Sequence, residues 1–212
     1  MFWEWVFIIS FAVILSAFTG IRAFLPLTLT ALLAKFNLLS VKSFYNVPFI
    51  EFLTDDRVLA FLVIATVIEV VSDKIPAVDN FLDGVYSLLK PVISFVSIYG
   101  IFQTLEPWQS AIVAITFSLI STSTMMGTKS AVRLASTSTT AGTVNPVISF
   151  LEDLFVTIKT LLALLFSWLL PIIAFIVLIF VFILMFVFVK FSLKFLKSKV
   201  FLKSRLQKLI NP

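Results

Sequence analysis

The feature that most constrains the fold is a series of long apolar runs, the clearest of which extends from Pro171 to Val189 without a charged residue. A transmembrane helix needs about 20 apolar residues to cross the hydrocarbon core of a bilayer. The whole chain is 60% hydrophobic and only 13% charged, whereas soluble domains carry about 25% charged residues. A surface facing water does not accommodate this excess, so we expect an all-α integral membrane protein.

Six hydrophobic helical segments are predicted, some of them broken or re-entrant. They cover Trp5–Phe36, Arg57–Val71, Pro91 to the residue before Glu106, Trp108–Met126, Asn145–Leu170 and Pro171–Val189. The first segment is long for one crossing and is interrupted by Gly20, Arg22 and Pro26. It forms either one kinked helix or two half-helices that meet at this interruption. We treat residues 1–190 as one transmembrane domain.

A short sequence repeat suggests that this domain has two related halves. The residues Pro91–Phe95 are identical to Pro146–Phe150, and both copies open a predicted segment with proline in the first turn, where it is favoured. A fainter similarity pairs Gly20–Ala23 with Gly127–Ser130. Many transporters are built from such repeats and bind their substrates where the repeats meet. The halves would be residues 1–107 and 108–190.

The end of the chain is strongly basic. Seven lysines and arginines lie between Lys190 and Lys208, and no acid follows Asp153. The positive-inside rule places this tail in the cytoplasm. With six crossings the N-terminus and the connections 72–90 and 127–144 would be cytoplasmic too. Residues 191–212 serve either as a topology signal or as an amphipathic helix on anionic lipids; we expect no nucleic-acid partner.

Several kinds of chemistry are excluded by composition. The chain has no cysteine and no histidine, which excludes disulfides, thiolate sites and any catalytic pair that needs an imidazole. It also lacks a glycine-rich phosphate loop and a recognised metal-binding motif. We therefore predict no catalytic residues and no cofactor. The remaining candidates are charged residues inside apolar sequence, because such residues are costly in a membrane and often functional.

Arg22, with apolar runs on both sides, is the strongest of these candidates. It is either a buried cation that binds an anion or an internal acid, or a surface residue that extends to water. Glu69 and Asp73 are four residues apart and would share one helix face. They need Arg22, Lys74, a cation or a proton as a partner, unless they are solvated acids at the membrane interface.

Two more acids, Asp79 and Asp83, repeat this spacing. With Glu69 and Asp73 they form an oxygen-rich set of the kind that binds Mg²⁺ or Ca²⁺. The spacing matches no ion-binding loop of defined geometry. A metal site therefore stays one alternative, and the identity of any metal is unknown.

A tract rich in small and hydroxyl residues extends from Ser121 to Thr143 and contains Lys129 and Arg133 on one predicted helix face. The small residues permit close helix packing, including a homodimer. Alternatively the tract is a basic anion site, to which Asn145, as a helix cap, would add backbone donors.

Glu152 and Asp153 follow in the next predicted segment. Adjacent positions lie on different sides of a helix, so we expect only one of these acids to face a partner. Glu152 would pair with Lys129 or Arg133.

These motifs also carry a family resemblance. They comprise Gly20–Leu27, Glu69, Asp73–Asn80, Asp83, Lys90–Pro91, Lys129, Arg133, Asn145–Pro146, Ser149 and Glu152–Asp153. In this combination the sequence resembles a bacterial membrane family known as domain of unknown function 4126, over about residues 10–165. Lys90 stands where the family pattern is expected to have arginine, which keeps the charge but weakens a bidentate grip. The resemblance implies a multi-pass protein of the bacterial inner membrane and no established activity.

The leading functional hypothesis is transport or channelling of a small solute, an ion or a lipid headgroup through a central polar cavity. Arg22, Lys129 and Arg133 would bind the anionic part. Glu69, Asp73 and Glu152 would act as counter-ions or as the site that couples a proton or cation. The alternatives are a non-transporting scaffold, in which ion pairs only hold helices together, and an intramembrane enzyme that acts on lipid.

Overall fold

The computed structural model describes residues 2–140, 143–166, 168–187 and 190, and it leaves out the side chains at positions 43, 76–81 and 83. All regular structure in the described part is helical. The elements are α1 (Phe2–Ile21), α2 (Leu25–Lys35), the 3₁₀ helix η1 (Lys42–Asn46), α3 (Pro48–Thr54), α4 (Asp56–Ser72), α5 (Pro76–Ile101), α6 (Pro107–Thr140) and α7 (Asn145–Leu165), followed by a further apolar helix, Leu169–Val187. The predicted basic tail, residues 191–212, lies outside the described residues.

Four helical segments in the described part are long and apolar enough to cross a membrane. They are Phe2–Ile21, Gly84–Ile101 within α5, Pro107–Thr140 and Leu169–Val187. The prediction of a helical membrane protein is thereby supported, but the predicted count of six is not obtained. The difference lies in α4 and α7, because α4 has only 17 residues and α7 contains three charged side chains.

The first predicted segment consists of two antiparallel helices that meet at residues 22–24. Pro26 lies in the first turn of α2, where its missing N–H and fixed φ are tolerated. The same residue cannot continue α1, because a proline inside a helix removes a hydrogen bond and clashes with the preceding turn. The hydroxyl of Thr28 lies 2.7 Å from that of Thr66, which places α2 alongside α4. The open choice between a kinked helix and two half-helices is thus decided in favour of two helices.

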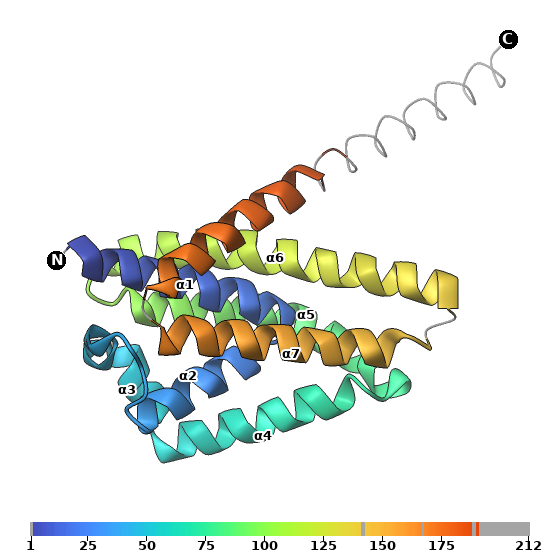
Figure 1. Cartoon of the computed structure of the whole chain (residues 1–212), viewed down its shortest axis with the longest axis horizontal. Coiled ribbons are helices and arrows are strands. Elements are labelled where there is room, and N and C mark those ends of the chain that lie inside the picture. Colours follow the sequence, from blue (N-terminus) through green and yellow to red (C-terminus); the bar gives the residue numbers. More distant parts are fainter. Residues whose placement is uncertain (1, 141–142, 167, 188–189, 191–212) are drawn as a thin grey trace, which may run out of the picture.

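Because α2 runs back beside α4, the last helix runs in the opposite direction to the one predicted from six segments. In Figure 1 the helices α1, α4, α6 and Leu169–Val187 run one way along the bundle, whereas α2, α5 and α7 run back. Successive long helices of the described chain therefore alternate in direction along the bundle. The start of α1 and the end of the last described helix point to opposite ends of the bundle, and the predicted arrangement of six crossings is not confirmed.

Two other predicted boundaries are wrong because α5 and α6 are longer than expected. Pro91 lies inside α5, which continues through it for 26 residues. The hydroxyl-rich tract belongs to α6, a single helix of 34 residues. The two copies of the repeat consequently occupy different settings, since Pro146 is in the first turn of α7 and Pro91 is in a helix interior. The internal repeat is not confirmed.

Small and hydroxyl side chains let α1 pack closely against α5 and α6. A Cβ atom added at Gly20 would lie 2.8 Å from Cβ of Met125 in α6, which is too close for real atoms. The hydroxyl of Ser94 in α5 donates to that of Ser16 at 2.9 Å, and the Ser16 hydroxyl donates to the carbonyl of Phe117 at 3.2 Å. This pattern is the one expected for helices packed inside a membrane protein.

All four tryptophans lie at one end of the bundle, which we call the tryptophan end. Trp3 and Trp5 are in the first turn of α1, Trp108 is at the start of α6, and Trp168 precedes the last helix (Figure 1). All four are exposed, as is typical of a membrane–water interface. Lys129 is 21 residues beyond Trp108 on α6, which corresponds to about 32 Å, close to the thickness of a hydrocarbon core. We call the opposite end the charged end.

Candidate functional site

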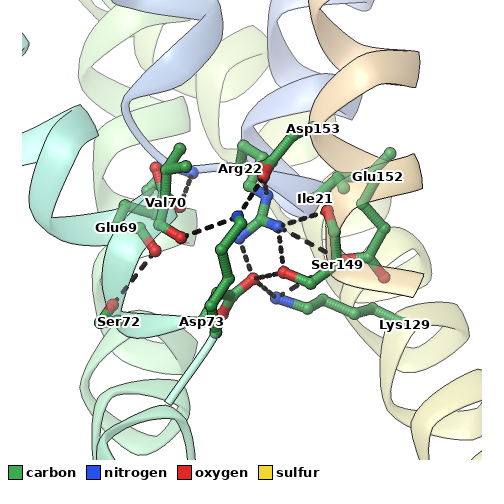
Figure 2. A network of polar contacts seen from close by, with 12 residues as sticks. Ile21, Arg22, Glu69, Val70, Ser72, Asp73, Lys129, Ser149, Glu152 and Asp153 are labelled. Carbon is green, nitrogen blue, oxygen red and sulfur yellow. Dashed lines mark hydrogen bonds and ion pairs between the residues drawn. The ribbon is translucent and has the colours of Figure 1, made fainter. Parts of the chain in front are cut away.

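Arg22 lies in the connection between α1 and α2, with no exposed surface. Its guanidinium forms an ion pair with Asp73, and its Nε lies 2.7 Å from Oδ1 of Asp153. Nη2 donates to the hydroxyl of Ser149 at 2.9 Å and to its carbonyl at 3.0 Å, and it lies 3.7 Å from Oε2 of Glu152 (Figure 2). The prediction of a buried cation paired with internal acids is confirmed, and the surface alternative is wrong.

Glu69 and Lys90 hold the two helix ends on either side of Arg22. The carboxylate of Glu69 accepts hydrogen bonds from the backbone N–H groups of Ala23 at 2.6 Å and Phe24 at 3.0 Å, just before α2. The ammonium of Lys90 donates to the carbonyl of Ile21 at 2.9 Å, where α1 ends. An acid at a helix N-terminus and a base at a C-terminus satisfy free backbone groups and complement the helix dipoles. The break in the chain is therefore a stabilised element of the fold.

One oxygen of Asp73 is shared by three cations. Asp73 directly follows α4, and its Oδ2 pairs with Arg22, with Nζ of Lys129 at 3.5 Å and with Nη2 of Arg133 at 3.1 Å. The hydroxyl of Ser149 donates to the same oxygen at 2.9 Å. Lys129 and Arg133 come from successive turns of α6, which bears out their predicted common face.

Glu152 and Asp153 in α7 both reach the cluster. Oε2 of Glu152 lies 3.8 Å from Nζ of Lys129, so this predicted pair is confirmed. Asp153 contacts Arg22 and also Nζ of Lys74, at 2.9 Å. The expectation that only one of the two acids would face a partner is wrong. The guanidinium of Arg22 is a wide fork, and it presents Nη2 to one acid and Nε to the next.

Three predicted site residues are not placed in this cluster by the described structure. Asn145 is the first residue of α7 and not its cap, and its side chain donates to the hydroxyl of Thr137 at 3.2 Å. The side chains of Asp79 and Asp83 lie outside the described part, so their role stays a prediction. Among the residues described, no group of three or more acids is placed to hold a metal ion.

Two residues of the cluster were not among the predicted site residues. Lys90 is 3% exposed and Ser149 has no exposed surface. Apart from their place in the family motifs, the sequence offered one signal, a lysine inside apolar sequence at position 90. Nothing in the local sequence distinguishes Ser149 from the many hydroxyl residues that only pack helices.

A cavity of about 700 Å³ adjoins the cluster between α6 and α7, and its walls are mainly apolar. Lys129 and Glu152 line it, whereas Arg22 and Asp73 do not. The charged residues thus form a largely buried network of ion pairs that borders the cavity at Lys129 and Glu152. Lys129 is 22 residues from the start of α6 at Pro107 and 11 from its end at Thr140, so the network lies nearer the charged end than the tryptophan end.

The cluster falls within a region that comparison with known families identifies. The model of the family described as Domain of unknown function (DUF4126) matches residues 9–190, which include every charged residue of the cluster. No curated protein matches the chain, and no solved structure matches it. The family match covers most of the chain. The protein therefore belongs to the domain of unknown function 4126 family.

Proposed function

We propose that the protein is a membrane transporter that binds the anionic part of a small solute or of a lipid headgroup at the edge of the charged cluster. The observation that carries this proposal is the position of Glu152. This acid lies between the buried cations and the cavity, where an incoming anion would replace it. The same site would serve an ion as cargo.

The broken helix supports this reading. In many transporters, helices that stop within the bundle bring their ends and charged side chains to the substrate site. Here Glu69 and Lys90 occupy the two helix ends. These residues form the fixed part of the site. The movable part is then on α6 and α7, which line the cavity.

Glu152 is the most weakly held acid of the cluster. Its Oε2 lies 3.7 Å from Arg22 and 3.8 Å from Lys129, and it has no hydrogen-bond partner among the described residues. Asp73, by contrast, is bound by Arg22 and by the Ser149 hydroxyl at close range. Displacing Glu152 breaks no hydrogen bond, so an anion exchanges with it at a lower free-energy cost. We propose that this exchange is the binding step.

Transport assays on proteoliposomes test the proposal. The probes are radiolabelled phosphate, sulfate and lactate for soluble anions, and fluorescent phosphatidylglycerol with dithionite quenching for headgroup movement. We expect Lys129→Gln to lower the flux of the transported probe at least about tenfold, because a charge-assisted contact is lost. Glu152→Gln removes the competing acid and should raise the apparent affinity.

Lys35→Gln is the matched control. Lys35 forms an exposed ion pair with Asp56 at the tryptophan end, far from the cluster. Its loss should leave flux unchanged, and size-exclusion chromatography and thermal unfolding verify that each variant is folded. A folded Lys129→Gln variant with wild-type flux would contradict the proposed mechanism.

A second function, a non-transporting scaffold, is favoured by how completely the deep charges are paired. Glu69 and Lys90 bind backbone groups at helix ends, and Asp73 pairs with Arg22. None of the three lines the cavity. A scaffold predicts no flux for any probe above protein-free liposomes, together with loss of folding when Arg22 is replaced. The transporter predicts flux that depends on Lys129 in a folded protein.

A further inference from the structure

Lys159 is a cation that the charged cluster does not use. It follows Glu152 by seven residues on α7, which is two turns and about 10 Å along the same face. Its side chain is half-buried, lines the cavity, and forms no ion pair with any residue that the structure describes. Lys159 is also about 9 Å from the end of α7 at Leu165, on the side of the tryptophan end. If Trp168 marks the membrane surface, the backbone of Lys159 lies about 9 Å or more below it along α7.

The surroundings of Lys159 are those of a pocket for an apolar chain. The cavity is lined by Met125 from α6, by Leu151, Phe155 and Ile158 from α7, and by Phe180 from the last helix. Its volume of about 700 Å³ is in the range of sites for small-molecule ligands, about 300–1,000 Å³. Its two cations, Lys129 and Lys159, lie along one apolar groove.

We propose that this cavity binds a single-chain carboxylate amphiphile, such as a long-chain fatty acid, with the carboxylate on Lys159 and the chain along the apolar wall. This inference rests on the proposed function, for which it names the substrate class. A cation among apolar side chains is costly unless an anion accompanies it. One ammonium group matches one carboxylate in charge.

The depth of Lys159 distinguishes this occupant from a phospholipid. A phospholipid headgroup lies at the membrane surface and would have to bring two chains with it to reach Lys159. An amphiphile with one chain can instead enter the groove and place its carboxylate at Lys159, part of the way along it. A second binding position lies two helical turns along α7, at Glu152 and its partner Lys129 of α6. There the carboxylate would exchange with Glu152. The two cations and the intervening acid thus suit stepwise movement along α7.

Binding of tritiated palmitate to the full chain in phosphatidylcholine nanodiscs tests the proposal, with empty nanodiscs as background. We expect saturable binding by the wild type and an affinity at least about tenfold lower for Lys159→Met. Lys159→Arg keeps the charge and should retain binding. Lys35→Met, which removes an exposed cation at the tryptophan end, is the matched control and should bind as the wild type does.

Competitors identify the chemistry of the ligand. Hexadecanol has the chain without the charge and acetate has the charge without the chain, so neither should displace palmitate. Displacement by hexadecanol as strong as by unlabelled palmitate, or stronger displacement by phosphatidylglycerol in the nanodisc, would overturn the proposal. Ile158→Trp narrows the groove without touching a charge and should weaken binding. If Lys159→Met does not fold, wild-type affinity in Ile158→Trp counts against the cavity.

The results also separate this inference from the proposed function. Palmitate binding that depends on Lys159, without flux of palmitate itself or of any other probe in proteoliposomes, supports the pocket and rejects transport. Flux that depends on Lys129, with palmitate binding unchanged in Lys159→Met, supports transport and rejects this substrate class.

Discussion

Arg22 organises the cluster because its guanidinium has three nitrogen atoms that point to three different residues. Nη1 faces Asp73 after α4, Nε faces Asp153 and Nη2 faces Ser149, the last two on α7. A lysine in the same place has one ammonium group and cannot reach all three partners. The residue thus ties the hairpin of α1 and α2 to two other helices.

Replacing Arg22 should reveal this role as a loss of stability. Arg22→Met leaves Asp73 and Asp153 without their shortest contacts, and removing one partner of a buried ion pair costs about 3–5 kcal/mol. Arg22→Lys should lose less, because one ion pair survives. Thermal and denaturant unfolding in detergent measure both variants. Lys35→Met, which breaks an exposed pair, should cost under about 1 kcal/mol; an equal effect of Arg22→Met would contradict this role.

Glu69 should respond to substitution in a graded way, since its two oxygens accept from two backbone N–H groups. Glu69→Gln keeps one acceptor oxygen, whereas Glu69→Leu leaves both N–H groups buried without a partner, at about 1–3 kcal/mol for each. We therefore expect Glu69→Leu to unfold at a clearly lower temperature than Glu69→Gln. Equal unfolding temperatures for the two variants would show that the oxygens do not hold the start of α2.

The charged residues of the cluster could be predicted from sequence better than their partners. Arg22, Asp73 and Lys129 stand out because few charges occur within apolar runs. Which acids pair with Arg22 depends on the position of its guanidinium relative to α7, and the local sequence contains no information about that position. For this reason the shared role of Glu152 and Asp153 was not predicted.

At the scale of elements, the two prolines Pro26 and Pro91 have opposite outcomes. Near Pro26 one helix ends and another begins, and the free backbone groups at these two ends are bound by Glu69 and Lys90. At Pro91 the helix continues, and neighbouring helices in a membrane protein tolerate such a residue. Sequence rules mark both positions as possible breaks. The helix is interrupted only where residues distant in sequence, here from α4 and α5, bind the free backbone groups.

Two helical glycines provide a matched test of packing between elements. A Cβ at Gly20 would lie 3.0 Å from Cα of Thr122 and closer still to Met125, whereas one at Gly127 would have no neighbour within 4 Å. Gly20→Ala should force α1 away from α6 and destabilise the fold by about 1–3 kcal/mol. Gly127→Ala should instead stabilise α6 by up to about 1 kcal/mol through helix propensity. Unfolding temperatures that change in the same direction would contradict the close approach of α1 and α6.

At the scale of the whole molecule, α2 decides the topology. This helix spans only 11 residues, about 16 Å, so it is too short to be recognised as a membrane crossing by length and hydropathy. It nevertheless returns the chain toward the tryptophan end, beside α4 (Figure 1). The hydrophobic segments were largely predictable from the sequence, whereas the direction in which each one runs depended on this short helix.

The absence of cysteine from the chain makes this topology testable with single-cysteine variants. Phe2→Cys and Thr104→Cys are exposed positions at the tryptophan end. Ser138→Cys is an exposed position in α6, and Lys190→Cys is an exposed position shortly after the last helix. We propose that the charged end faces the cytoplasm, because the last helix runs toward it and the basic residues that follow favour that side. A membrane-impermeant maleimide should then label the first pair in intact cells and the second pair only after permeabilisation. Labelling of Phe2→Cys and Lys190→Cys from the same side would place both positions on one side of the membrane and contradict the proposed orientation of the last helix.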